Sequence, residues 1–120
     1  MHKVMLVEDD PTMVMLLDTL LEIEGYHVVK PETFDNLLED VRASAPDVIL
    51  MDVHLPGING VELIAEFRQD GRIKDVRVIM SSGMDVRQQC MENGADDFIL
   101  KPYMPDELIK KIKNQINSEE

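Results

Sequence analysis

Short, almost wholly apolar runs recur along the chain and predict five strands. Residues 4–7 read Val-Met-Leu-Val and residues 47–52 read Asp-Val-Ile-Leu-Met-Asp, a composition typical of strands buried on both faces of a sheet. Three similar runs cover residues 27–30, 76–80 and 97–100. Because stretches with helical periodicity separate these runs, the pattern predicts a parallel sheet flanked by helices.

The intervening stretches carry apolar residues at spacings of three and four, which predicts amphipathic helices. The first helix has Asp10 as a candidate cap, Pro11 in its first turn and Gly25 at its end. Its predicted inward positions are Met13, Leu16, Leu17, Leu20 and Leu21. The stripes predicted for the second, third and last helices are Phe34, Leu37, Leu38 and Val41; Val61, Leu63, Ile64 and Phe67; and Leu108, Ile109, Ile112 and Ile116. A short fourth helix over residues 86–92, ending before Gly94, completes a doubly wound α/β fold with five strands and five helices.

Length and composition predict one domain over residues 1–120. Domains commonly have roughly 100–150 residues, and the hydrophobic share of 44% is ordinary for a globular protein. No apolar stretch approaches the roughly 20 residues that cross a bilayer, and the N-terminus is not typical of a cleavable signal. We therefore expect a cytoplasmic protein without membrane association.

Charge and cysteine content narrow the function classes. The chain has 12 Lys and Arg against 24 Asp and Glu, and its net charge of −12 repels a phosphate backbone. Direct nucleic-acid binding is therefore not expected, whereas cations and basic partner surfaces are favoured. Cys90 is the single cysteine, so it cannot form an internal disulfide and is interpreted as a small buried apolar residue.

Polar side chains stand at the carboxyl ends of four predicted strands. Residues 8–10 are Glu-Asp-Asp after the first strand, Asp52 ends the third, Ser82 follows the fourth and Lys101 follows the fifth. In an open α/β sheet the ligand site lies beyond these strand ends, near the point where strand order reverses. The sequence therefore predicts that several carboxylates, a hydroxyl and an ammonium gather at one rim of the sheet.

Each of these residues has an ordinary structural explanation when it is taken alone. Acidic residues at positions 8–10 complement the dipole of a helix N-terminus, and Asp52 or Ser82 could bond to the backbone of a loop. Lys101 alone would be a solvated side chain. These explanations do not predict the joint placement at four strand ends, so we favour a shared site.

Crowded carboxylates need a cation or bound protons at neutral pH. Mg²⁺ fits this requirement, since it prefers oxygen ligands and binds through one or two carboxylates together with phosphate oxygens. A carboxylate can then act as a nucleophile toward a phosphoryl group, while the metal and a lysine offset charge on the transferred oxygens. Ser82 would donate a hydrogen bond to one of these oxygens.

These residues resemble the markers of the receiver domains of bacterial two-component response regulators, and the resemblance covers essentially the whole chain. The markers are an acidic pair after strand one, an aspartate after a buried strand, a Leu-Pro-Gly loop, a serine followed by a small residue, and a Gly-Ala-Asp-Asp-Phe-Ile-Leu-Lys-Pro segment. In this sequence they stand at Glu8 and Asp9, Asp52, residues 55–57, Ser82 and Gly83, and residues 94–102. The resemblance implies a flavodoxin-like sheet with strand order 2-1-3-4-5.

The resemblance also implies how the acidic rim works. Asp52 would accept a phosphoryl group from a phosphohistidine on a sensor histidine kinase or a phosphotransfer protein. Asp9, Asp52 and the backbone carbonyl of His54 would bind Mg²⁺, with Glu8 acting directly or through water. Lys101 would contact the phosphoryl group. The chain would then be a signalling domain that assists its own phosphorylation and dephosphorylation, and not an enzyme.

A conformational switch is implied as well. A cis peptide bond before Pro102 would hold the preceding lysine in position. Ser82 would move toward the phosphate and Phe98 would turn inward behind it, which would alter the partner-binding surface. A plain core role explains Phe98 equally well, because it lacks the hydroxyl that a switch tyrosine could bond outside.

Three features depart from the family pattern. Glu8 stands where aspartate is commoner, and its extra methylene changes its reach toward a cation. His54 lies two residues after Asp52, where a side chain can influence the access of water, although a loop histidine without a metal role is the simpler interpretation. Residues 83–94 form a shorter stretch than in many relatives, which predicts an altered partner surface around the fourth helix.

Other classes of protein explain less of this sequence. A magnesium phosphohydrolase would place a second acid two residues after its aspartate nucleophile, where this chain has His54, and would carry a cap domain. A flavin-binding electron carrier would have a Ser/Thr/Gly-rich phosphate loop after the first strand in place of three acids. A receiver-like binding module that never takes phosphate stays open, although Asp9, Asp52 and Lys101 are all present.

Overall fold

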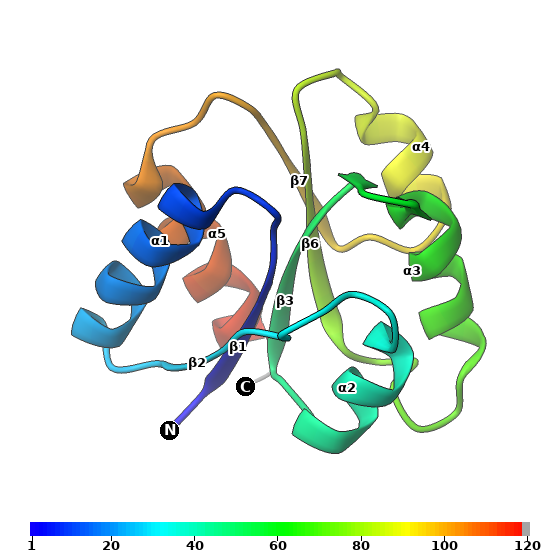
Figure 1. Ribbon diagram of the computed structural model, residues 1–120, viewed down its shortest axis with the longest axis horizontal. Coiled ribbons are helices and arrows are strands. Elements are labelled where there is room, and N and C mark those ends of the chain that lie inside the picture. The colour runs from blue at the N-terminus through cyan, green and yellow to red at the C-terminus, as the bar shows by residue number, and fades with distance from the viewer. Residues whose placement is uncertain (119–120) are drawn as a thin grey trace.

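The computed structural model describes residues 1–118 as three layers, with a five-stranded sheet between two layers of helices (Figure 1). The strands are β1 (Lys3–Val7), β2 (His27–Val29), β3 (Val48–Asp52), β6 (Arg77–Ser82) and β7 (Asp97–Leu100). They lie in the order β2-β1-β3-β6-β7, and each neighbouring pair is parallel. This order equals the predicted 2-1-3-4-5, so the doubly wound, flavodoxin-like fold is confirmed.

Helices cover both faces of the sheet (Figure 1). The first face carries α1 (Pro11–Ile23) and α5 (Pro105–Ser118), and the second carries α2 (Leu37–Ser44), α3 (Gly60–Gln69) and α4 (Arg87–Glu92). The fourth helix is short, as predicted, with six residues. None of the described helices is both long and apolar enough to cross a membrane.

The predicted boundaries of the first helix are confirmed by its capping geometry. Asp10 Oδ1 accepts hydrogen bonds from the backbone N–H groups of Thr12 and Met13, at 3.0 and 3.3 Å. Gly25 follows the helix with a φ of +92°, and Gly94 follows α4 with a φ of +113°. Glycine adopts this left-handed conformation without the steric cost that a Cβ would bring, which explains why both helices end there.

Each face of the sheet has its own hydrophobic core. Alternate residues of β3 divide between them: Val48 and Leu50 face α1 and α5, whereas Ile49 and Met51 face α2, α3 and α4. All four side chains are fully buried, which explains why this strand is apolar at successive positions. Cys90 is also fully buried and free, as predicted.

Two predicted helix positions are wrong. Leu16 does not face inward: it is 43% exposed, whereas Leu17 and Leu21 are fully buried. Successive residues of a helix point about 100° apart, so Leu16 points away from the buried side of the helix, on which Leu17 lies. Phe34 does not belong to the second helix, because α2 begins at Leu37, but it packs partly buried against the same core from the preceding turn.

The loop predicted after the third strand contains a small hairpin. β4 (His54–Leu55) and β5 (Ile58–Asn59) pair antiparallel around Pro56 and Gly57. Gly57 has a φ of +71°, the conformation required at the third position of a turn that has proline at the second. The hairpin delivers Asn59 to cap α3, where its Oδ1 accepts a hydrogen bond from Val61 N at 3.0 Å.

One arginine joins three segments at the amino-terminal edge of the sheet. The guanidinium of Arg68 donates to the carbonyls of Gly94, Lys74 and Val76 and to Asp96 Oδ2, at distances of 2.8, 2.9, 2.5 and 2.8 Å. These acceptors lie between α4 and β7 and between α3 and β6. We call this set of contacts the Arg68 clamp.

Candidate functional site

The strand register aligns three polar side chains at the carboxyl end of the sheet. Val7 pairs with Met51, so Glu8 comes next to Asp52, and Asp52 pairs with Ser81. By the alternation of side chains along strands, all three lie on the face covered by α1 and α5. All three are buried. The rim predicted from the strand ends is therefore present, with Ser81 as an additional member.

Lys101 joins the two buried carboxylates. Its Nζ lies 2.8 Å from Glu8 Oε2 and 2.6 Å from Asp52 Oδ2. The side chain reaches them from the segment after β7, where Lys101 N donates to Ser82 O at 2.8 Å. The peptide bond between Lys101 and Pro102 is cis, as the resemblance implied. Residues from the ends of β1, β3 and β7 thus meet at one point.

Three carboxylates at this point could hold a metal ion. Glu8, Asp9 and Asp52 each offer an oxygen, and these oxygens lie within 4.8 Å of one another. Asp9 is exposed while the other two side chains are buried, so the cluster opens to solvent on one side. An all-oxygen donor set with an open side fits Mg²⁺, which keeps several of its waters, and lacks the sulfur and nitrogen ligands that zinc favours.

Burial and ion pairing act against each other in this cluster. Burial raises the pKa of Glu8 above its ordinary value, although the hydrogen bond from Lys101 opposes that effect. Burial lowers the pKa of Lys101, but the hydrogen bonds to Asp52 and Glu8 outweigh it and raise the pKa above the ordinary lysine value. The lysine is therefore a permanent cation at neutral pH, and it supplies the positive charge that the two carboxylates need.

The backbone after β3 fixes the direction of Asp52. His54 N donates to Asp52 Oδ1 at 3.0 Å, while the His54 imidazole is exposed and stands outside the carboxylate cluster found among the described residues. Gly60, the first residue of α3, packs against the same backbone. A Cβ at Gly60 would lie 2.9 Å from Val53 Cα and 3.0 Å from Asp52 O. This close approach admits only glycine without a shift of the loop.

Ser82 and Phe98 lie on the opposite face of the sheet from the carboxylates. Ser82 is fully buried, and its Oγ accepts a hydrogen bond from Met84 N at 3.0 Å. Alternation from Met80 places it on the side of the core that holds Phe98, which is 4% exposed. The Ser82 hydroxyl is therefore bonded to the backbone of its own loop, and the Phe98 side chain is buried in the core.

The sequence did not predict two hydroxyls near the carboxylates. Ser81 Oγ and the Tyr103 hydroxyl are both buried without a hydrogen-bond partner among the described residues. The sequence signal for Ser81 was its spacing of two residues from Ile79, which places both side chains on one face once β6 extends two residues beyond the predicted strand. Tyr103 follows Lys101 by two residues in a loop, and no periodicity indicated its direction.

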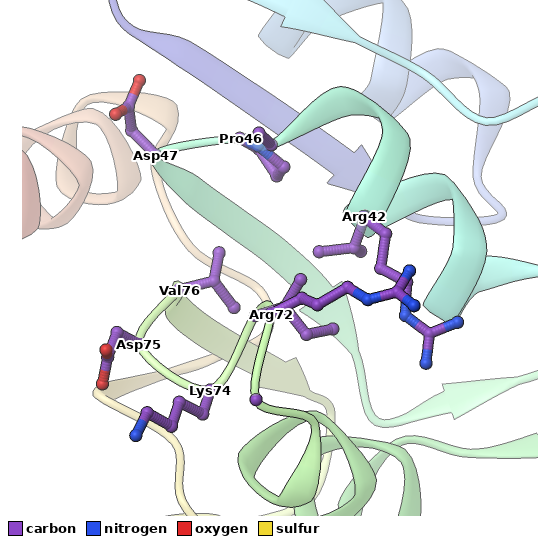
Figure 2. A pocket seen from close by; sticks show the side chains of 11 residues that line it. Arg42, Pro46, Asp47, Arg72, Lys74, Asp75 and Val76 are labelled. Carbon is purple, nitrogen blue, oxygen red and sulfur yellow. The ribbon is translucent and has the colours of Figure 1, made fainter.

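A separate cavity of about 220 Å³ lies beside α2 and the loop before β6, near the amino-terminal edge of the sheet (Figure 2). The side chains of Arg42 and Arg72 extend toward one another along it (Figure 2). Arg42 is already paired, because it donates to Asp70 and to Glu39. None of the predicted site residues lines this cavity, so the candidate chemistry lies at the opposite edge.

Comparisons with known proteins agree with this geometry. The family model of the response regulator receiver domain matches residues 4–113. The phosphate regulon transcriptional regulatory protein PhoB of Escherichia coli K12 is 32% identical over 115 residues, which cover 93% of this chain and 50% of PhoB. The chain thus spans about half the length of the curated relatives it matches.

Solved structures give the same result. A putative response regulator from Chloroflexus aurantiacus has a TM-score of 0.87 and 31% identity, with 97% of this chain and 98% of that chain covered. The BeF3-activated N-terminal receiver domain of Klebsiella pneumoniae RstA has a TM-score of 0.84 and 27% identity, with 96% and 98% covered.

Proposed function

The chain belongs to the response regulator receiver domain family of two-component systems, and we propose that it accepts a phosphoryl group on Asp52 from a phosphohistidine donor in a Mg²⁺-dependent reaction. The observation that carries this proposal is that Asp52 and Glu8 meet at Lys101. The lysine Nζ lies 2.6 Å from Asp52 Oδ2 and 2.8 Å from Glu8 Oε2. A buried aspartate beside one fixed cation is suited to hold a phosphoryl group.

The transfer uses Asp52 as the nucleophile. A carboxylate oxygen of Asp52 bonds to phosphorus as the phosphorus–nitrogen bond of phosphohistidine breaks, and the imidazole keeps the electron pair. Lys101 leaves the carboxylate and donates to an oxygen of the transferred group. His54 N holds the other carboxylate oxygen at 3.0 Å, so the attacking oxygen keeps its direction.

Glu8, Asp9 and Asp52 would hold the metal, together with the backbone carbonyl of His54. Bound Mg²⁺ supplies positive charge next to the transferred phosphoryl oxygens. The three carboxylates and the incoming group together carry more negative charge than Lys101 alone can offset, which is why we propose that the reaction depends on the cation.

Phosphorylation would then change the rim through Ser82. Its hydroxyl accepts from Met84 N in this structure, and we propose that it turns to donate to a phosphoryl oxygen. Phe98 shares the core face of Ser82 and would repack with it, altering the surface formed by α4 and β7. The domain assists its own phosphorylation and dephosphorylation and is not an enzyme that acts on a separate substrate.

We propose that the partner is a sensor histidine kinase or a phosphotransfer protein in the cytoplasm, because such proteins carry the phosphohistidine that the reaction requires. A net charge of −12 opposes direct contact with nucleic acid. The effector that reads the switched surface is a protein.

Incubation with Mg²⁺ and acetyl phosphate, followed by intact-mass measurement, tests the proposal. The wild-type chain should gain one phosphoryl group, and Asp52→Asn should gain none. Asp75→Asn is a matched control, since Asp75 is an exposed acid at the other edge of the sheet and should leave the adduct intact. An adduct that persists in Asp52→Asn, or one that forms equally in excess chelator, contradicts the proposal.

A further inference from the structure

An open hollow of about 330 Å³ lies between α2 and α3, and we call it the α2–α3 groove. Its apolar walls are Phe34 and Leu38, from α2 and the turn before it, and Ile58 and Leu63, from β5 and α3. All four side chains pack against the core yet remain partly exposed. The volume is at the lower end of the roughly 300–1,000 Å³ typical of ligand pockets, which suits one or two side chains of a partner.

Carboxylates line the α2–α3 groove beside these apolar side chains. Asp35, Glu39 and Glu66 are exposed members of its lining, and Arg42 is the cation among them. Arg42 is already paired, because its guanidinium donates to Glu39 at 2.9 Å and to Asp70 at 2.8 Å. The carboxylates of Asp35 and Glu66 have no ion pair among the described residues. The groove therefore presents uncompensated negative charge around an apolar interior.

The α2–α3 groove is separate from the carboxylate cluster but adjoins the hairpin that follows it in the chain. Neither Asp52 nor Lys101 lines the groove. Ile58 belongs to β5, and its partner across the hairpin is Leu55, the residue after His54. A ligand in the groove would thus contact the hairpin without entering the phosphoryl site, so binding there does not require that Asp52 accepts phosphate.

We propose that the α2–α3 groove is a docking site for a basic amphipathic segment of a partner protein. An aliphatic or aromatic side chain of the segment would lie against Leu38 and Leu63, which removes exposed apolar surface from water. Lysine or arginine side chains next to it would pair with Asp35 and Glu66, whose charges no residue of this chain offsets. Apolar anchors flanked by cations are the form in which an amphipathic helix occupies a groove with an acidic rim.

Charge argues against two other occupants of the groove. A second copy of this chain has a net charge of −12 and would bring further acids to an acidic rim. The same carboxylates would repel an anionic lipid surface. Sedimentation velocity detects self-association, and co-sedimentation with phosphatidylglycerol vesicles detects lipid binding. Either result in the wild type, if it is lost in Leu63→Ser, would overturn the inference.

A synthetic peptide in which pairs of leucine alternate with pairs of lysine is the probe, because it forms an amphipathic helix with cations beside its apolar face. Its binding to the full chain is followed by amide NMR shifts. The largest shifts should fall at residues 34–39, 58 and 63–66, which border the groove. Peptides with glutamate at every lysine, or serine at every leucine, should bind at least about tenfold more weakly. Absence of binding by the leucine–lysine peptide, or shifts centred outside these residues, would overturn the inference.

Matched variants separate docking in the groove from general charge or stickiness. Glu66→Lys reverses an exposed, unpaired charge and should weaken peptide binding about fivefold, whereas Glu22→Lys makes the same change on the exposed side of α1 and should stay within about twofold. Leu63→Ser shortens an apolar wall and should weaken binding about tenfold, whereas Met15→Ser, at a 70% exposed position of α1, should not. The amide spectrum of each variant reports whether it is folded. Equal effects within either pair of variants would overturn the inference.

Discussion

Lys101 and Asp52 are 49 residues apart in the chain, yet Lys101 Nζ lies 2.6 Å from Asp52 Oδ2. Their strands are not neighbours, because β6 lies between β7 and β3. The lysine side chain therefore crosses the end of β6 to reach the aspartate. Lys101 thus links the segment after the edge strand, β7, to the end of the central strand, β3.

Replacing Lys101 with alanine should separate metal binding from the switch. The variant should retain Mg²⁺ binding but lose most of the conformational response to beryllofluoride, because the contact to the phosphoryl oxygens is gone. In the absence of metal, Glu8 and Asp52 lose their cation, so the free energy of unfolding should fall by about 2 kcal/mol, less than for a fully buried pair because the lysine is 28% exposed. Urea unfolding with chelator and with Mg²⁺ measures the loss of stability and the retained metal binding, and amide NMR shifts on addition of beryllofluoride measure the conformational response. An unchanged response in the variant contradicts this role.

Lys111→Ala is the matched control for that experiment. Lys111 has a similar exposure of 30% and pairs with Asp97 at 3.1 Å, outside the carboxylate cluster. Its loss of stability relative to the wild type should be the same with chelator and with Mg²⁺. A metal-dependent loss in this control would assign the Lys101 result to general surface charge.

A methyl group at Gly60 should damage both stability and phosphorylation. The Cβ of Gly60→Ala would meet backbone atoms of Val53 and Asp52 at 2.9 and 3.0 Å, so the loop after β3 must shift. We expect a loss of about 1–3 kcal/mol in the free energy of unfolding and slower phosphorylation by acetyl phosphate. Gly71→Ala, where nothing lies within 4 Å of a Cβ, should change neither. Equal behaviour of the two variants would show that the close approach is unimportant.

Ser81 and Ser82 are adjacent and fully buried, but their alanine variants should change stability in opposite directions. The Ser81 hydroxyl has no partner among the described residues, so Ser81→Ala removes a desolvated polar group and should stabilise the protein by about 1 kcal/mol. Ser82→Ala removes the acceptor of a 3.0 Å hydrogen bond from Met84 N and should cost about 1 kcal/mol. Urea unfolding of both proteins without phosphodonor tests this contrast, which fails if both variants lose stability.

Asp70 should make stability depend on acid pH. The backbone hydrogen bond from Arg72 and the side chain of Arg42 hold the pKa of Asp70 below its ordinary value. Such a group stabilises the fold above the pKa of the unfolded chain, about 3.9, and this stabilisation is lost as the pH falls through the folded-state pKa. The free energy of unfolding should therefore fall less steeply below about pH 4 in Asp70→Asn than in the wild type. Equal slopes for Asp70→Asn and the wild type would refute the assignment.

The strands and the acidic rim were predictable because they depend on local composition. β3 is buried on both faces, so its apolar run needs no knowledge of its neighbours, and Asp52 ends it wherever the sheet is placed. Parallel strands share a carboxyl edge, which is why the acids and Lys101 could be expected to meet. The distances that make Lys101 a bridge between two carboxylates, and not a partner of one, depend on packing and were not predictable.

The errors concern features that tertiary contacts decide. Leu16 has the same spacing as buried residues of α1, but the width of the buried stripe depends on how much of the helix the sheet covers. Phe34 has helical spacing to Leu37 and Leu38, yet the chain turns before the helix begins. Tyr103 lies in a loop, where no periodicity indicates the direction of the side chain, so its burial in the core that faces α1 and α5 appears only in three dimensions.

The Arg68 clamp makes the amino-terminal ends of the strands more rigidly held than their carboxyl-terminal ends. At the amino-terminal edge, one guanidinium pins the starts of two strands through bonds that need no cation or phosphate. At the opposite edge, the ties are charges that a ligand can rearrange. We therefore expect ligand binding to displace only the loops that follow β6 and β7. The amide hydrogens of these loops should exchange faster than those at the amino-terminal end of the sheet, which the Arg68 clamp protects.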